Sequence, residues 1–304
     1  MSLNIVFMGT PSFAVPTLEK LSQSNYLIKQ VYSQPPKKSN RGMKLEKSPV
    51  HIFAETNHLP IRTPNKLQED FDFFKSLEVD LVIVVAYGQI ISKEFLSLSK
   101  HGFLNIHASI LPKWRGAAPI QRSIMAQDAF TGISIMKIEE QLDAGPVLLT
   151  EKINLDLTTT AGEVENKLAD IGANKIIEAI NLIQNNKAEF VAQKDADSTY
   201  AKKIKKEDEK INWSEDAKKI IAQIHGLNPR PGAYFEYRGE KIKVWKSAYS
   251  QETGKAGWVL NNNLHIACGT GSIIITEIQR PGKTIQKAND FLLGFSIPKG
   301  TQLF

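Results

Sequence analysis

The densest group of residues able to do chemistry lies at the end of a short apolar segment, Phe103 to His107. Asn105 and His107 are two residues apart in it, so in a strand both side chains project to the same face. An amide donor beside an imidazole can stabilise the negative charge that develops on a carbonyl oxygen during acyl transfer. An isolated Asn-x-His pair is more often a hydrogen-bonded strand end, so the catalytic interpretation needs further residues.

The carboxylate that could complete such a site is Asp143, in the run from Leu142 to Pro146 that follows a predicted strand. An aspartate in a Gly–Pro turn is usually only a turn residue. Beside a histidine in space, it would orient the imidazole, raise its basicity or remove a proton from an attacking amine. The loop from Pro112 to Pro119 carries Trp114 and Arg115, which are costly to expose without a use.

The elements that must position these residues are strands alternating with helices over residues 1 to about 190. Apolar runs predict strands at 4–9, 26–32, 80–87, 103–107 and 133–139, and helical patterns lie at 13–21, 48–56, 121–126 and 161–184. This alternation predicts an α/β fold with an open, mostly parallel, Rossmann-like sheet. Because such sheets bind ligands at the carboxyl ends of their strands, Asn105 and His107 stand where a site is expected.

The pattern changes in the last third of the 304-residue chain. A polar, lysine-rich stretch is followed by a helix at 215–224 and by five short predicted strands at 233–237, 241–245, 256–260, 264–268 and 272–279. Five short strands at this spacing are typical of a small β-barrel, of which the oligonucleotide-binding (OB-like) barrel is one form. The sequence therefore predicts domains at 1–192 and 208–304, joined by a basic linker at 193–207.

The net charge of +6 is unevenly distributed. Residues 1–200 are close to neutral, whereas residues 201–304 carry 17 lysines and arginines against 10 acidic residues. Such an asymmetry suggests one neutral working domain and one domain that meets a polyanion, although a solubilising lysine surface is an equal alternative on charge alone.

Several classes of protein are disfavoured by what the sequence lacks. It has no phosphate-binding loop, no dinucleotide fingerprint after Gly9, and no histidine or acidic spacing that suits a metal, so no metal is expected. Cys268 is the only cysteine, and the longest apolar run, 81–87, is far short of the roughly 20 residues of a membrane span. We therefore expect a cytoplasmic protein without membrane attachment.

The motifs together resemble those of the 10-formyltetrahydrofolate-dependent formyltransferases. The resemblance rests on the Asn-x-His pair, on Ser109–Ile110–Leu111–Pro112, on the run 114–121 and on Asp143–Ala144–Gly145. It extends from Phe7–Ala14 through Ala86–Gln89 to Gln279–Lys283, so it covers nearly the whole chain. Lys113 stands where the family commonly has arginine, which is a like-charge difference.

The resemblance implies roles for particular residues. Asn105, His107 and Asp143 stand at the family's catalytic asparagine, histidine and aspartate. The co-substrate would be 10-formyltetrahydrofolate, and the resemblance implies that it binds the segments Ser109, Ile110, Leu111, Pro112 and Tyr87, Gly88, Gln89. The family fold, an α/β formyltransferase domain followed by a barrel that binds tRNA, agrees with the division predicted from charge and periodicity.

The basic residues divide into two groups. The resemblance implies that the loop 34–45 matches one that, in members acting on tRNA, enters the acceptor stem, with Arg41 at a functional arginine and Lys37, Lys38 and Lys44 beside it. On sequence alone this loop would be solvated. Lys202, Lys203, Lys205 and Lys206 lie on the predicted linker and could follow the phosphate backbone of initiator methionyl-tRNA.

The expected reaction is attack of the free methionine amine of initiator methionyl-tRNA on the formyl carbon, through a tetrahedral intermediate. The product is formylmethionyl-tRNA for translation initiation, and the enzyme is expected to be a monomer. An N-formyltransferase of amino-sugar nucleotides, a non-catalytic RNA-binding protein and a glycinamide-ribonucleotide formyltransferase are alternatives. The basic loop and tail argue against the first, the intact catalytic residues against the second and the additional barrel against the third.

Overall fold

The computed structural model describes residues 3–39 and 44–304 and divides into two compact units. Unit 1 takes in the chain up to residue 116, together with 132–152 and 165–200. Unit 2 takes in 117–131, 153–164 and 201–304. Two short segments of the first 200 residues thus belong to unit 2, and the predicted limits at residues 192 and 207 stay a prediction.

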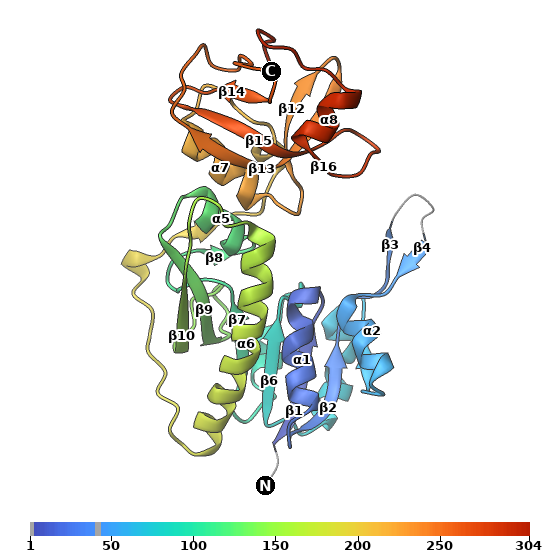
Figure 1. Cartoon of the computed structure of the whole chain (residues 1–304). Helices are drawn as coiled ribbons and strands as arrows, with labels where there is room; N and C mark the ends of the chain where they lie inside the picture. Colours follow the sequence, from blue (N-terminus) through green and yellow to red (C-terminus); the bar gives the residue numbers. More distant parts are fainter. Residues whose placement is uncertain (1–2, 40–43) are drawn as a thin grey trace. The chain divides into compact units, whose positions relative to one another are not determined.

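Unit 1 is built on a seven-stranded sheet whose strands lie in the order β10-β9-β7-β6-β1-β2-β5 (Figure 1). Neighbouring strands from β7 to β5 pair in parallel, and β9 pairs with β7 in antiparallel register. This confirms the predicted open, mostly parallel α/β sheet. The strands are β1 (Asn4–Gly9), β2 (Leu27–Tyr32), β5 (Ile61–Arg62), β6 (Leu81–Val85), β7 (Phe103–His107), β9 (Phe130–Lys137) and β10 (Val147–Asn154).

Helices cover both faces of this sheet because the central strands are apolar on both sides. All five residues of β6 are buried. The helices that include unit 1 residues are α1 (Val15–Ser22), α2 (Pro49–Thr56), α3 (Phe71–Ser76), α4 (Lys93–Leu96) and α6 (Ala161–Gln184). Helices α1 and α6 lie side by side, and Lys20 of α1 donates a hydrogen bond to Asn174 of α6.

The packing of α6 against β7 shows which face of the sheet carries the side chains of Asn105 and His107. A Cβ added at Gly172 of α6 would lie 2.7 Å from the Ile106 side chain, so this helix approaches β7 closely on the Ile106 face. Phe103, Asn105 and His107 therefore project from the opposite face, since side chains alternate along a strand. Phe103 packs there against Phe74 of α3, with ring centroids 6.1 Å apart.

A short hairpin leaves the sheet after β2. Its strands, β3 (Lys37–Ser39) and β4 (Lys44–Glu46), pair in antiparallel register, and Figure 1 shows them projecting away from β2 and α2. Helix α2 follows, and its N-terminal cap is the Ser48 hydroxyl, which accepts a hydrogen bond from the His51 backbone N–H.

Unit 2 contains a five-stranded antiparallel sheet in the order β12-β13-β15-β14, with β16 paired to β15. Isoleucines of α7 and the aromatic ring of Phe291 in α8 share one buried cluster with the sheet. The elements are β12 (Ala233–Tyr237), β13 (Glu240–Ser250), β14 (His265–Ala267), β15 (Ser272–Gln279), β16 (Gln286–Lys287), α5 (Pro119–Met125), α7 (Ala217–Gly226) and α8 (Ala288–Gly294).

Four of the five strands predicted for unit 2 are present, and the prediction at 256–260 is wrong. That stretch forms only isolated pairings, of Trp258 with Gln302 and of Val259 with Ile266. Gly257, at φ +80°, turns the chain out of an extended path there. The fifth strand is instead β16, whose two residues are too few to give an alternating pattern.

Candidate active site

Asn105 and His107 are brought to the predicted position at the carboxyl end of β7. Their strand lies between β6 and β9, with Asn105 paired to Val84 on one side and to Met136 on the other. Asn105 is half-buried, whereas only 6% of the His107 side chain is exposed. The two polar side chains therefore stand on one strand face just beyond the apolar cluster that contains Phe103.

Hydrogen bonding assigns distinct roles to the two ring nitrogens of His107. Nε2 lies 2.9 Å from the Trp114 carbonyl oxygen, and a carbonyl can only accept, so Nε2 carries a proton and donates. Nδ1 faces the Asp143 carboxylate, with Oδ2 at 3.8 Å. The ring is thus fixed from the loop side, and Nδ1 remains the nitrogen available for chemistry.

Asp143 is held beside His107 by the backbone of the loop that follows β7. Its Oδ2 accepts a hydrogen bond of 2.8 Å from the Gly116 N–H, and 15% of its side chain is exposed. Asp143 itself adopts φ +49°, the left-handed region that aspartate tolerates better than most residues. The turn that the sequence suggested therefore does more than reverse the chain: it carries a fixed carboxylate to the imidazole.

The segment Ser109–Pro112 forms the first turn of the loop after β7. The fully buried Ser109 hydroxyl donates to the Lys113 carbonyl at 2.6 Å. Ser134 of β9 donates from its hydroxyl to the Ser109 carbonyl at 2.7 Å and accepts from the Leu111 N–H at 3.1 Å. The Ser109 side chain thus shapes the loop, and binding of a folate by Ser109, Ile110, Leu111 and Pro112 stays a prediction.

The segment Tyr87–Gln89 also has structural contacts at the end of β6. Tyr87 is 2% exposed and packs in the apolar cluster, and Gly88 adopts φ +83°. The Gln89 side chain accepts from the Leu67 N–H at 2.7 Å and donates to the Pro64 carbonyl at 3.0 Å. Beside it, Ile90 and Phe95 line a hollow of about 310 Å³. Contact of these residues with a folate likewise stays a prediction.

Arg115, a residue that is costly to expose without a use, is buried in the structure. The guanidinium is fully buried: Nε and Nη2 donate to Gln193 Oε1 at 3.0 and 2.9 Å, and Nη2 donates to Asp195 at 2.8 Å. Gln193 and Asp195 lie in the stretch predicted to be a linker, and sequence reasoning missed both. The signal that could have found them is the cost of burying Arg115 without acceptors.

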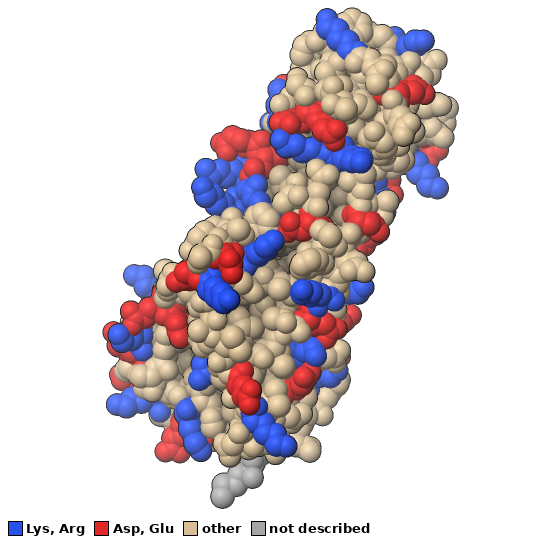
Figure 2. Space-filling model, turned by 90° about the vertical axis from the view of Figure 1, so that its left-hand side faces the viewer, with Lys and Arg blue, Asp and Glu red and all other residues tan. Residues whose placement is uncertain are grey.

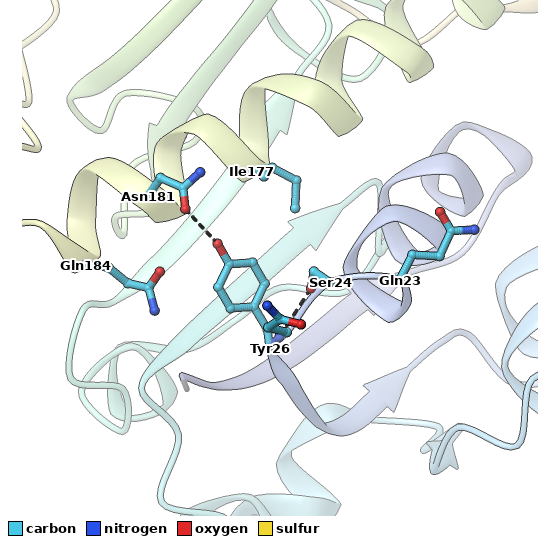
Figure 3. A pocket seen from close by; sticks show the side chains of 7 residues that line it. Gln23, Ser24, Tyr26, Ile177, Asn181 and Gln184 are labelled. Atoms are coloured by element: carbon cyan, nitrogen blue, oxygen red, sulfur yellow. Dashed lines mark hydrogen bonds between the residues drawn. The ribbon is translucent and has the colours of Figure 1, made fainter. Parts of the chain in front are cut away.

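A cavity in unit 1 lies at the end of the sheet where β2 begins. It measures about 500 Å³ and is lined by Gln23, Ser24, Asn25 and Tyr26, before β2, and by Ile177, Asn181 and Gln184 of α6 (Figure 3). The Tyr26 hydroxyl donates to Asn181 at 3.0 Å across it. Because it adjoins the start of β2, this cavity is separate from the strand ends that carry Asn105 and His107.

The basic residues predicted to bind tRNA are only partly described. Arg41 lies outside the described residues, as do the side chains of Lys38 and Lys44, whereas Lys37 is exposed on β3. All of Lys202, Lys203, Lys205 and Lys206 are exposed. On the face drawn in Figure 2, acidic side chains are interspersed with basic ones, so the count of basic residues alone does not mark a single anion-binding patch there.

The backbone of these lysines in unit 2 is fixed by Arg122 of α5. Its guanidinium donates to the carbonyls of Lys202 and Lys203 at 3.0 and 3.2 Å. It also forms a two-pronged pair with Asp208 at 2.8 and 3.1 Å, which lowers the pKa of that carboxyl. The lysines thus extend from an anchored main chain.

Within residues 3–39 and 44–304, no group of three histidine, cysteine, aspartate or glutamate side chains could hold a metal ion. In the same ranges, none of the helices combines the length and the apolar character needed to cross a membrane.

Comparison with known families and proteins adds to this geometry. The family model described as formyl transferase matches residues 3–180, and the formyl transferase C-terminal domain matches residues 203–296. The methionyl-tRNA formyltransferase of Pelagibacter ubique (strain HTCC1062) is 50% identical, covering 100% of this chain and 99% of the relative. That of Caulobacter vibrioides (strain NA1000 / CB15N) is 45% identical, covering 99% and 100%.

Solved structures share the fold at lower identity. The sugar 3N-formyl transferase WlaRD, determined with dTDP and 5-N-formyl-THF, is 22% identical with a TM-score of 0.67, covering 93% of this chain and 100% of its own. HypX from Aquifex aeolicus is 17% identical with a TM-score of 0.68, covering 97% of this chain and 49% of its own. At these identities the likeness concerns the fold alone.

Proposed function

This chain belongs to the formyl transferase family, and from that premise we propose that it transfers the formyl group of 10-formyltetrahydrofolate to the amine of methionyl-initiator tRNA. The observation that best supports this reaction is the fixed pair at the carboxyl end of β7, where Nδ1 of His107 lies 3.8 Å from Oδ2 of Asp143. The acceptor follows from the full-length likeness, at 45–50% identity, to proteins named methionyl-tRNA formyltransferase.

Asn105 and His107 act on the oxygen of the formyl group. As the amine attacks the formyl carbon, charge develops on this oxygen, and an amide N–H of Asn105 donates to it. His107 donates from Nδ1 when that nitrogen is protonated, because Nε2 is held by the Trp114 carbonyl. A preorganised donor aimed at such an oxygen is typically worth about 3 kcal/mol of barrier.

Asp143 removes the proton that the amine loses on acylation. Its Oδ2 is engaged by the Gly116 N–H and faces Nδ1 of His107, so the carboxylate serves both the amine and the imidazole. The tetrahedral intermediate then breaks the bond between the formyl carbon and N10, and tetrahydrofolate leaves as N10 takes up the proton that the amine has lost, so no covalent enzyme intermediate is needed. Burial raises the pKa of the Cys268 thiol, in unit 2, to about 12, which keeps the only cysteine of the chain un-ionised at neutral pH.

The formyl donor is the second substrate, and the site has features that suit it. The proposed catalytic cluster offers hydrogen-bond donors, and exposed apolar side chains lie in the turn that carries Asp143 and in the loop after β6. Ile90, after β6, is 94% exposed, and Leu142, directly before Asp143, is 64% exposed. Exposed aliphatic side chains beside polar donors suit a flat heteroaromatic ligand with a polar edge, such as a reduced folate.

Basic residues hold the tRNA in this proposal. The hairpin β3–β4 carries Lys37 and leads to Arg41, and the Arg122-anchored main chain presents the four lysines between 202 and 206. Phosphate contacts of this kind supply affinity and register but little sequence selectivity. We further propose that the enzyme acts in the cytoplasm as a monomer.

A paired formylation assay tests the proposal. The purified protein is supplied with 10-formyltetrahydrofolate and either methionyl-initiator tRNA or an amino-sugar nucleotide, and the formylated product is measured by mass spectrometry. We expect formylmethionyl-tRNA from the first acceptor only, with free methionine as a control for the need for tRNA. Formylation of the amino-sugar nucleotide alone would replace the proposed acceptor, and formylation of neither would contradict the transfer reaction.

A further inference from the structure

Gln193 connects two loops that meet at the proposed catalytic carboxylate. Its Nε2 donates to the Asp143 carbonyl at 2.9 Å and to the Gly145 carbonyl at 2.7 Å. Its Oε1 accepts both hydrogen bonds from Arg115, at 3.0 and 2.9 Å. One side-chain amide therefore satisfies donors on one side and acceptors on the other.

The chemistry of its neighbours requires an amide at this position. The Arg115 guanidinium can only donate and the two carbonyls can only accept, so the orientation of the Gln193 amide is determined. A carboxylate of the same size would satisfy Arg115 but would set an oxygen against the two carbonyls. An apolar side chain would leave the buried guanidinium and both carbonyls without these partners.

The backbone next to Gln193 is itself fixed in unit 1. Val191 pairs with Val147 at the start of β10 through two hydrogen bonds, of 2.8 and 2.9 Å. This pairing sets the side chain of Gln193 beside the turn that precedes β10. The opposite side of that turn rests on β9, because a Cβ added at Gly145 would lie 2.0 Å from the Lys137 carbonyl oxygen.

Together these contacts close a ring around Asp143. Its carboxylate is held by the Gly116 N–H, its carbonyl by Gln193, and Gln193 by the side chain of Arg115, the residue before Gly116. Asp143 adopts a left-handed conformation, which persists where surrounding contacts determine it. Loss of the Gln193 contacts would let the turn relax and move the carboxylate relative to His107.

We propose that Gln193 is a positioning residue, which holds the Asp143 turn so that its carboxylate faces the His107 ring. This inference rests on the proposed role of Asp143 and assigns a function in the reaction to a residue outside the motifs. Gln193 contacts neither the imidazole nor the carboxylate in these interactions, so it acts through the backbone of the turn.

The test is a double-substitution cycle in the full-length protein, with formylation of methionyl-initiator tRNA as the readout. Gln193→Glu keeps the acceptor for Arg115 and removes both donors to the turn. We expect kcat to fall about 10- to 100-fold, since misplacement by about 1 Å costs this much, with the KM for tRNA changed less than about threefold. In the Asp143→Ala background, Gln193→Glu should change kcat less than about twofold.

A matched control separates positioning from general damage. Asp195→Asn removes the charge of the exposed carboxylate that pairs with the buried Arg115 guanidinium, keeps an amide oxygen that can accept the same hydrogen bond, and leaves the contacts of Gln193 in place, so kcat should stay within about twofold of wild type. If Gln193→Glu lowers the yield of folded protein, Gln193→Asn, which keeps the amide on a side chain one methylene shorter, provides the second variant for the cycle.

The outcomes are distinguishable. If Gln193→Glu leaves kcat at the wild-type value, the positioning role is wrong while the proposed function stands. The same conclusion follows if Gln193→Glu lowers kcat equally in the wild-type and Asp143→Ala backgrounds. Absence of formylation by the wild-type protein contradicts the proposed function instead.

Discussion

The proposed catalytic residues His107 and Asp143 in unit 1 and the lysine segment 202–206 of unit 2 use hydrogen bonds in opposite ways. At the proposed catalytic residues the side chains themselves are fixed: His107 by the Trp114 carbonyl, Asp143 by the Gly116 N–H. In the lysine segment only the main chain is fixed, by Arg122, and the lysine side chains extend into solvent.

This difference follows from what each region is proposed to do. Proton transfer and stabilisation of an oxyanion depend on direction and on distances within a few tenths of an ångström. Attraction between an ammonium group and a phosphate acts over the Debye length of about 8 Å at physiological salt and tolerates mobile side chains. A single substitution should therefore strongly lower turnover at the proposed catalytic residues but only slightly weaken the binding of tRNA at the lysine segment.

The largest expected effect is the loss of turnover on removing a catalytic side chain. Asn105→Ala and Asp143→Ala should each lower kcat about 100-fold or more, because each removes a group that acts on charge developing in the transition state. Steady-state formylation with saturating folate measures this, and thermal unfolding checks that each variant folds. Glu140→Ala is the matched control, since this exposed carboxylate near the same turn pairs with exposed Lys93.

Near-normal turnover in either variant would remove that residue from the mechanism. A loss as large in Glu140→Ala would show that the region responds to any change of charge, and the contrast between fixed and mobile groups would fail.

The sequence predicted those parts of the fold whose pattern is local. The apolar run of β6 and the periodic stretch 161–184, which forms α6 with these bounds, were predicted because burial imposes periodicity on them. Strand β10 was missed because it is an edge strand: most of its residues are half-buried or exposed, so no clear alternation results. Helix α8, with seven residues, was missed because it is too short for a helical repeat to stand out.

At the site, the motifs predicted where Asn105, His107 and Asp143 come together, and the geometry agrees. The sequence did not predict their support. Gln193 reaches Asp143 only because Val191 pairs with Val147, a contact between residues far apart in the chain. The burial of Arg115 could not be predicted, because an isolated arginine in the sequence gives no sign of the acceptors that allow it.

An intermediate effect is expected where charge acts without fixed geometry. Replacing Lys202, Lys203, Lys205 and Lys206 together by alanine should weaken binding of tRNA about tenfold or more near physiological salt. It should also reduce the slope of log affinity against log salt by up to about 3, whereas each single substitution should reduce it by less than about 1. Filter binding between 50 and 300 mM KCl measures the slope.

Four exposed lysines of unit 1 supply the matched control. Replacing Lys75, Lys100, Lys167 and Lys187 by alanine changes the net charge equally, at positions outside the proposed contact region. Equal slopes for the two fourfold variants would mean that total charge, and not the Arg122-anchored segment, governs the binding of tRNA.

The smallest effect concerns a second fixed histidine, His225 in α7, which has no proposed chemistry. Its Nδ1 donates to the Leu157 carbonyl at 2.7 Å and its Nε2 accepts from the Ser247 N–H at 3.2 Å. Both nitrogens are thus consumed and the ring must be neutral, whereas His107 keeps Nδ1 for the site. Burial lowers the pKa of His225 below its usual 6.5.

The sign of the pH dependence follows from this lowered pKa. Between the lowered value and 6.5, the unfolded chain binds more protons than the folded one at this histidine, so its contribution to stability falls as the pH falls through that range. His225→Leu should lower the free energy of unfolding by about 1–3 kcal/mol at pH 7.5, because two buried backbone groups lose their hydrogen-bond partner. Between pH 7.5 and pH 5.5, the free energy of unfolding of this variant should fall less than that of the wild type. Urea unfolding followed by tryptophan fluorescence reports on unit 2, which holds three of the four tryptophans.

The control variant is His58→Asn, at an exposed histidine. It should keep the wild-type pH dependence of stability, and kcat should be unchanged in both variants. If His225→Leu keeps the full pH dependence, the buried ring is not its source. If it lowers kcat as Asp143→Ala does, the buried ring also supports the proposed catalytic residues.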